Sequence, residues 1–148
     1  MSANPFASFE IHIPKKYQEA VKQFCRTANK ETPESVPFER QVDFWFMAFL
    51  IAVKKELPPV KESDTYNATV ASILSSDPKR VSYMQLAVLG ITEKFEMLAN
   101  HREVFNICLE LANAGMPYLI QILRDEDDRP LWAILSELDS LTKVLKLY

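Results

Sequence analysis

The sequence predicts a mainly α-helical protein: one helical domain over residues 1–148, with about seven helices and a short N-terminal β-strand. Three observations lead to this prediction. The chain has only 2 glycines, which leaves little room for tight hairpins. Apolar residues recur at helical spacing along most of its length. Residues 42–53 (VDFWFMAFLIAV) are nearly all apolar, too uniformly for a surface helix and over too short a stretch to span a bilayer, so they indicate a buried central helix.

The first element is a strand over 8–13 (SFEIHI), because polar and apolar residues alternate there with the period of a half-buried strand. The residues expected to face the core are Phe9, Ile11 and Ile13. Those expected to face outward are Ser8, Glu10 and His12. A helix over 14–28 follows, since proline suits the first helical position and apolar residues then recur at helical spacing.

The central helix is predicted over 38–55, after a polar loop with two prolines. Lys54 and Lys55 lie at its C-terminal end, where cations suit the helix dipole. Asp43 is the one charged residue within its apolar stretch. A buried carboxylate needs a partner, and Arg40 or a backbone N–H at the helix start could supply it. Asp43 and Arg40 are therefore the candidate buried polar site, with a structural hydrogen bond as the favoured interpretation.

The second half of the chain is predicted to hold further amphipathic helices. Residues 66–74 fit either a short helix or a strand, because their β-branched content competes with a helical spacing. A helix over 82–92 is expected to begin at Ser82, and a short one to cover 92–99. Asn100 is expected to cap the next helix, since Glu103 follows at capping-box spacing.

The remaining helices are predicted over 101–114, 116–124 and 130–147. Gly115 is expected to end the first of them as a C-terminal cap, and Met116–Pro117 to start the next. The last helix has one leucine-lined face. That face could cover the core or pair with its twin in a homodimer.

No catalytic, cofactor or metal motif is recognisable in the sequence. The two histidines, His12 and His101, have no further ligand at metal-binding spacing. The acidic run 125–128 lacks the alternation and central glycine of a calcium loop. Cys25 and Cys108 lie on apolar stripes as expected for core residues. Because the N-terminus has no secretion signal and no membrane span is present, a cytoplasmic protein is expected.

The order of a short strand, Pro–Lys–Lys and two helices is also that of a ribbon-helix-helix DNA-binding module. In this alternative the residues facing DNA would be Ser8, Glu10 and His12, with Lys15 and Lys16 near phosphates. The first 61 residues carry nine lysines and arginines against seven acidic residues, which is a small basic excess. Glu10 disfavours the alternative, because DNA repels a carboxylate that accepts no hydrogen bond from a cytosine.

Three segments carry a resemblance to a known family: IHIPKKYQEAVKQF (11–24), PFERQVDFWFMAFLIAVKK (37–55) and EVFNICLELANAGMPYLIQIL (103–123). In this order and spacing they resemble a small family of proteins encoded beside bacterial DNA phosphorothioation (sulfur-modification) genes. The family pattern includes a late Tyr-Ala-Asn-Gly-Gly-like element. This chain has Leu-Ala-Asn-Ala-Gly at 111–115, and Ala52 where the family often has glycine.

The resemblance implies a bacterial, cytoplasmic accessory protein of a DNA-modification or anti-phage defence locus, and it implies no catalytic residues. Together with the absence of a recognisable chemical motif, it favours a non-enzymatic accessory or interaction protein. The partners expected are other proteins and a second copy of the chain in a homodimer, with DNA as the alternative. No cofactor and no metal ion are expected.

Overall fold

The computed structural model describes residues 4–25 and 36–125. Its architecture is mainly helical with a small antiparallel sheet, which confirms the predicted class. The strands are β1 (Glu10–Pro14) and β2 (Thr65–Val70). The α-helices are α1 (Gln18–Gln23), α2 (Gln41–Lys54), α3 (Pro78–Thr92) and α4 (His101–Asp125). Short 3-10 helices are η1 (Lys15–Tyr17), η3 (Ala71–Ser76) and η4 (Phe95–Ala99).

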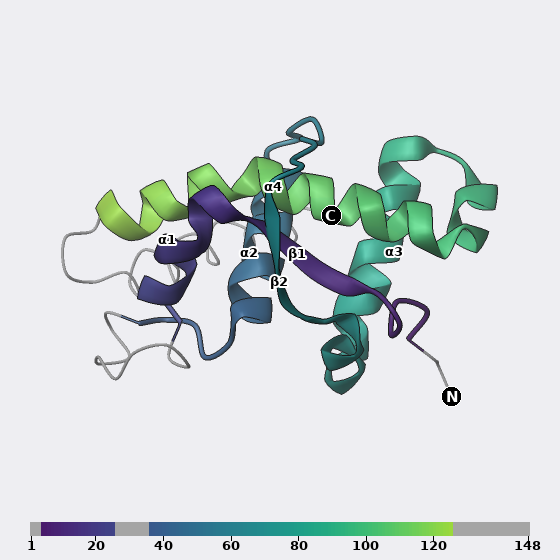
Figure 1. Ribbon diagram of the computed structural model, residues 1–148. Coiled ribbons are helices and arrows are strands. Elements are labelled where there is room, and N and C mark those ends of the chain that lie inside the picture. The colour runs from purple at the N-terminus through teal and green to yellow at the C-terminus, as the bar shows by residue number, and fades with distance from the viewer. Residues whose placement is uncertain (1–3, 26–35, 126–148) are drawn as a thin grey trace.

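The centre of the molecule is the packing of α2 against α4. Figure 1 shows α4 running the length of the molecule, with α2 crossing it behind the sheet. Within α2 every residue from Phe44 to Phe49 is buried, which confirms that the apolar stretch is a central helix. Trp45 stacks near Phe49 and Phe105, so the largest side chain of the core joins the two helices. None of the helices in the described residues is long and apolar enough to cross a membrane.

The prediction that Gly115 ends a helix is wrong, because α4 continues without a break through Asp125. The predicted helices 101–114 and 116–124 are therefore one, which is one reason why the described residues hold fewer helices than the total of about seven that was predicted. Pro117 lies inside this helix with its ring exposed. It has no N–H for the carbonyl of Asn113, and its ring crowds that carbonyl. The packing of α4 against α2 offsets this local cost.

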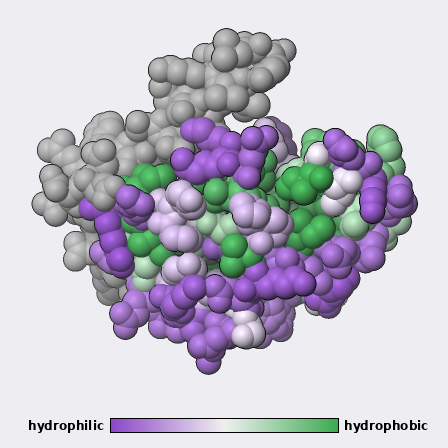
Figure 2. Space-filling model, turned by 90° about the horizontal axis from the view of Figure 1, so that it is seen from above, coloured by the Kyte–Doolittle hydropathy of each residue, from purple (hydrophilic) through white to green (hydrophobic). Residues whose placement is uncertain are grey.

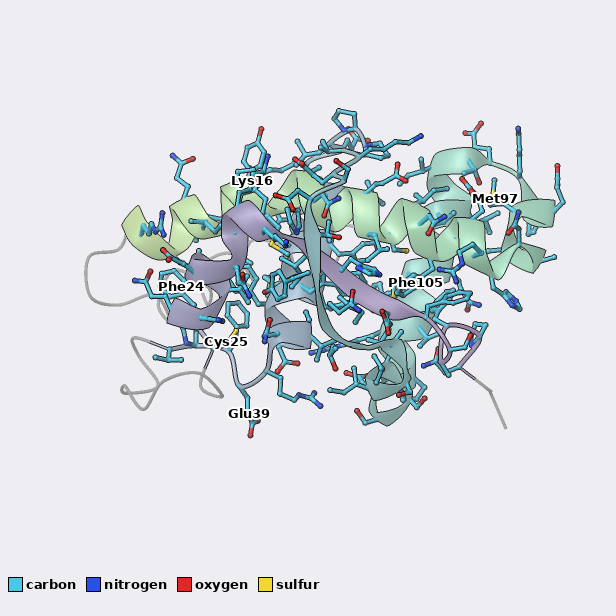
Figure 3. All side chains as sticks on the ribbon, in the orientation of Figure 1. Lys16, Phe24, Cys25, Glu39, Met97 and Phe105 are labelled. Atoms are coloured by element: carbon cyan, nitrogen blue, oxygen red, sulfur yellow. The ribbon has the colours of Figure 1, made fainter. Side chains whose placement is uncertain are left out.

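The two strands pair antiparallel within the chain, with Ile13 opposite Tyr66 and an irregularity between Ile11 and His12. Ile11 and Ile13 are fully buried, as the alternating pattern predicted. The segment 66–74, which fitted either a helix or a strand, contains both kinds of structure. The strand β2 ends at Val70, and the 3-10 helix η3 follows. Phe105 of α4 packs against the chain around β1, within ring contact of Phe6 and Phe9 (Figure 3).

Several predicted boundaries are corrected. The helix predicted over 14–28 is η1 followed by α1, which ends at Gln23, and α2 begins at Gln41 rather than at residue 38. Helix α3 begins at Pro78, in the first-turn position where proline needs no hydrogen-bond partner, so Ser82 lies inside the helix. The short helix over 92–99 is η4. The N-cap of α4 is confirmed, as Asn100 Oδ1 accepts from the Glu103 N–H at 3.2 Å.

Two predicted features lie outside the described residues. They are the helix over 130–147 and the acidic loop over 125–128, apart from the backbone of Asp125 at the end of α4.

Candidate functional site

Asp43 and Arg40 lie together at the start of α2. The backbone N–H of Arg40 donates to Asp43 Oδ2 at 3.1 Å, and Arg40 Nη2 lies 3.3 Å from Asp43 Oδ1. The Asp43 side chain is 18% exposed. The Asp43 carboxylate therefore caps the first turn of the helix. This is the structural hydrogen bond between Asp43 and Arg40 that the sequence favoured.

A third residue completes this group, and sequence reasoning missed it. Arg80 of α3 donates from Nη1 to Asp43 Oδ1 at 2.9 Å, and its Nε lies 3.3 Å from Asp77 Oδ2. Its guanidinium also lies over the ring of Phe46, 4.9 Å from the centroid. No spacing pattern in the sequence relates Arg80 to Asp43, 37 residues away. The group ties α2 to α3 and leaves Asp43 with two cationic partners.

Beside this group, a groove of about 390 Å³ lies between α2 and α3. Its walls are mostly apolar and include Phe46, Met47 and Leu50 of α2 and Tyr83 of α3. Asp43 and Arg80 also line it. Because the carboxylate already has two cationic partners, the groove offers apolar contact surface rather than a reactive polar centre.

The two lysines of η1, directly after the N-terminal strand, have partners within the chain. Lys16 forms a 2.6 Å contact with Glu62, and Lys15 lies 3.6 Å from Asp64. The hydrogen bond to Glu62 raises the pKa of Lys16. Figure 3 shows Lys16 at the turn from β1 into the following helical segment. Both lysines predicted near phosphates are thus neutralised by carboxylates from the loop before β2.

The other three residues of the DNA-binding alternative also lie on this face. Ser8 and Glu10 are exposed and His12 is half-buried. Asn67 of β2 donates to Glu10 Oε2 at 2.6 Å, and His12 Nε2 lies 4.0 Å from the same oxygen. In a ribbon-helix-helix dimer the strand would pair with a second copy, whereas β1 pairs with β2 of its own chain. The face is therefore an internally paired surface.

His12 also lines an open pocket of about 370 Å³ between the sheet, the loop before β2 and α4. The loop contributes Lys61 and Glu62, and the start of β2 contributes Thr65. Helix α4 contributes one stripe of four side chains at helical spacing: Asn106, Leu109, Glu110 and Asn113. The pocket gathers titratable and amide groups from segments far apart in sequence, and only His12 among them was a predicted site residue.

Asn113 is the buried polar residue of this pocket. The residue is 7% exposed, and its Nδ2 donates to the carbonyl of Val60 at 3.0 Å. The Val60 N–H donates in turn to the carbonyl of Glu110 at 3.0 Å, so the loop is fastened to α4 from both sides. The other end of the amide, Oδ1, is buried and accepts no hydrogen bond from the residues that the structure describes. The sequence did not predict this contact between Asn113 and the loop, because Asn113 was expected only to lie near the end of a helix.

The two cysteines are buried, as predicted for core residues, and they form no disulfide. Burial raises the pKa of Cys25 to about 12, with the nearby Asp43 charge acting in the same direction. Burial also raises the pKa of Cys108. Because the thiolate is the reactive form, both thiols are poorly suited to nucleophilic or redox chemistry. Within the described ranges, no group of three histidine, cysteine, aspartate or glutamate side chains could hold a metal ion.

Helix α3 carries an exposed stripe that sequence reasoning did not single out. Its members recur at alternating steps of four and three residues, the spacing of one face of a paired helix. We call it the α3 face: Lys79, Tyr83, Leu86 and Gly90 of the helix, together with Glu93, the left-handed C-cap residue just past its end. Leu86 is 64% exposed and Tyr83 is 51% exposed. Figure 2 shows apolar side chains reaching the surface among hydrophilic ones at the end of the molecule where α3 and η4 lie.

No family model, no curated protein and no solved structure matches this chain.

Proposed function

We propose that this chain is a non-enzymatic interaction protein that forms a homodimer through the α3 face. The observation that carries the proposal is the exposure of Leu86 and Tyr83 on one side of a regular helix. Large apolar side chains clustered on a surface are characteristic of protein–protein contact. Phe95 of η4, 77% exposed, lies shortly after the stripe in the chain and adds to the apolar surface at this end.

The occupant proposed for this face is a second copy of the same helix, running antiparallel. With Leu86 on the twofold axis, Lys79 lies opposite Glu93 of the partner subunit, because the two are seven residues from Leu86 on either side. The same register places the large ring of Tyr83 near Gly90 of the partner subunit. A Cβ built on Gly90 would have no neighbour within 4 Å, so there is room there for a partner side chain.

Self-complementarity favours a second copy over an unrelated protein. The α3 face has a cation at its N-terminal end, an anion at its C-terminal end and an apolar middle. Antiparallel pairing of identical faces matches the charges at both ends at once, whereas parallel pairing would place like charges together. Because the contact is symmetric, each pair of opposite charges occurs twice in the dimer.

The cellular setting proposed is a bacterial, cytoplasmic DNA-modification or anti-phage defence system. The resemblance carried by the three segments 11–24, 37–55 and 103–123 supports it. In that setting the dimer serves as an accessory subunit that binds another protein of the system. The internal pairing of Lys15 and Lys16 with carboxylates makes protein a better-supported partner than DNA.

Sedimentation velocity over a range of concentrations tests the dimer. The expected mass is twice 17.0 kDa, falling to 17.0 kDa on dilution. Leu86→Glu should leave helical content unchanged and give monomer throughout, because it buries a charge at the twofold axis. Val70→Glu is the matched control, since Val70 is 52% exposed and belongs to β2, not to the α3 face. A wild-type protein that stays monomeric at every concentration would overturn the proposal.

A further inference from the structure

Strand β2 has an edge that β1 does not fill, and two backbone hydrogen bonds fix which residues face it. The Lys15 N–H donates to the carbonyl of Asp64 at 2.9 Å, so Asp64, just before β2, is directed toward β1. The Ala71 N–H donates to the carbonyl of Phe9 at 2.8 Å, so Ala71, just after β2, is directed the same way. Backbone groups of an antiparallel strand alternate between facing the partner and facing away. Those facing away from β1 therefore belong to Thr65, Asn67 and Val70.

We call these outward groups the β2 edge, and they are unpaired in the part of the chain that the structure describes. No N–H or C=O of Thr65, Asn67 or Val70 forms a hydrogen bond with another described residue. The register agrees, because Pro14 stands opposite Thr65, at a position where a strand needs no N–H toward its neighbour. Asn67 and Val70 are exposed. The β2 edge thus offers three donors and three acceptors in an extended row.

The β2 edge lacks the features with which proteins protect the edge of a sheet. Such edges usually carry charged side chains or proline, which discourage pairing with another chain. The opposite edge, formed by β1, has both, because Glu10 is charged and Pro14 has no N–H to donate. The sequence of β2, TYNATV, has no charge, no proline and no glycine, and half of its residues are β-branched. Strand β2 is therefore suited to accept another strand.

We propose that the β2 edge binds an extended, uncharged segment of a partner protein, which adds to the sheet as a further strand antiparallel to β2. An extended backbone is the shape that matches such a row of donors and acceptors, and main-chain hydrogen bonds hold it there. Val70, 52% exposed, offers an apolar contact to a side chain of the added strand. The inference rests on the proposed role as an interaction protein but not on the dimer, because β2 and the α3 face are different elements.

A second copy of β2 does not match this edge. Because of the irregularity opposite Ile11 and His12, the outward residues of β2 follow one another at a step of two residues and then a step of three. Their partners on β1 are Pro14, His12 and Glu10, at even steps of two, so a regular strand fits them. A second β2, running antiparallel, would place its step of three against a step of two. The occupant is therefore a regular strand of another protein.

Amide hydrogen exchange, followed by NMR on the full-length ¹⁵N-labelled protein, tests the edge. In the free protein the amides of Tyr66 and Thr69, which face β1, should exchange at least tenfold more slowly than those of Asn67 and Val70. The probe is the peptide acetyl-Ser-Thr-Val-Thr-Val-Thr-Ser-amide, which at saturation should slow exchange at Asn67 and Val70 at least tenfold. The same peptide, N-methylated at two adjacent central residues, lacks a donor on each of its edges and should bind at least tenfold more weakly.

Val70→Pro is the most informative variant, because it removes an N–H that faces the edge and leaves the pairing with β1 intact. The backbone φ of Val70 is −80°, which proline accepts. This variant should bind the peptide at least tenfold more weakly. Val70→Ala is the matched control, since it keeps the N–H and should bind within threefold of wild type. Should Val70→Pro fail to fold, the N-methylated peptide decides the question.

No saturable peptide binding, equal binding of the N-methylated peptide, or unchanged binding to Val70→Pro would each overturn the proposal. Slow exchange at Asn67 and Val70 in the free protein would do so too, because the edge would then be covered by the chain itself. Protection that rises with protein concentration would assign the edge to a second copy and overturn the choice of partner. Sedimentation of the protein alone, where no added strand is present, tests the α3 face separately, so either proposal can fail without the other and Val70 stays a valid control there.

Discussion

Gly115 of α4 lies directly against the backbone of Ala48 in α2. A Cβ built on Gly115 would come 1.9 Å from the Ala48 carbonyl oxygen and 2.7 Å from its carbonyl carbon. Backbone atoms cannot move aside as the end of a side chain can, so the two helices cross at this distance only with glycine there. The contact explains why the chain keeps glycine inside a long helix, where that residue costs about 1 kcal/mol relative to alanine.

Gly115→Ala should therefore destabilise the protein by about 3 kcal/mol or more, since the added methyl forces α2 and α4 apart. Gly90→Ala is the matched control. It is the other glycine of the chain, also inside a helix, and its Cβ would meet nothing. It should stabilise the monomer by about 0.5–1 kcal/mol. Urea unfolding of both variants gives the two free energies, and equal effects would contradict the packing argument.

The Asp43–Arg80 contact should contribute more to stability than the exposed ion pairs. Its side chains are 18% and 22% exposed, whereas those of Lys15 and Asp64 are 57% and 80% exposed. Arg80→Met should cost about 1.5–3 kcal/mol, the range for hydrogen bonds to charged groups. Lys15→Met should cost less than about 1 kcal/mol. Thermal unfolding would contradict this account if the two variants lost the same stability.

Stability should fall as the pH rises from about 9 to about 12. Burial raises the pKa of Cys25 from 9.0 and of Tyr66 from 10.0, each to about 12. For each group the folded-state pKa exceeds the unfolded value, so the unfolded chain releases its proton first. The free energy of unfolding is then unaffected below pH 9 and declines through this window.

Denaturant midpoints measured across the same pH range check this prediction. Cys25→Ala and Tyr66→Phe should each flatten the decline, although Tyr66→Phe also lowers stability at every pH by removing the 2.8 Å hydrogen bond to Gln41. Tyr118→Phe is the control, because Tyr118 is 41% exposed. A slope that neither Cys25→Ala nor Tyr66→Phe changes would show that other groups cause the alkaline loss.

The parts of the fold that the sequence predicted are those set by local pattern. The apolar run 42–53 located α2, alternation located β1, and the Asn100 cap located the start of α4. The prediction of a helix end was wrong because the glycine on which it rested is needed for a contact with a residue far away in the sequence. Gly115 resembles a helix end locally, and only the position of Ala48 in space explains it.

The candidate sites divide in the same way. Asp43 and Arg40 are three residues apart, so helix geometry alone was enough to pair them. Arg80 and Asn113 find their partners 37 and 53 residues away, and no periodicity encodes such contacts. The α3 face was not predicted from the sequence for a different reason. Its stripe of one lysine, one tyrosine, one leucine, one glycine and one glutamate is not uniformly apolar, and only its exposure makes it stand out.

A charge exchange tests the antiparallel register of the dimer. Lys79→Glu and Glu93→Lys should each weaken self-association several-fold, because each places like charges together at both ends of the contact. The double variant should recover most of the wild-type affinity, since it restores opposite charges in reversed order. Sedimentation equilibrium at low salt gives the three constants. Losses that simply add in the double variant would contradict this register.

The central claim is that two copies of the chain meet at the α3 face with Leu86 on the twofold axis. Leu86→Cys tests it most directly, because only at such an axis does a residue meet its own counterpart. Under mild oxidation the account predicts a disulfide-linked dimer for Leu86→Cys and none for Val70→Cys, an exposed control on β2. The native thiols are buried and should not compete. Equal cross-linking of the two variants, or none in either, would contradict the claim.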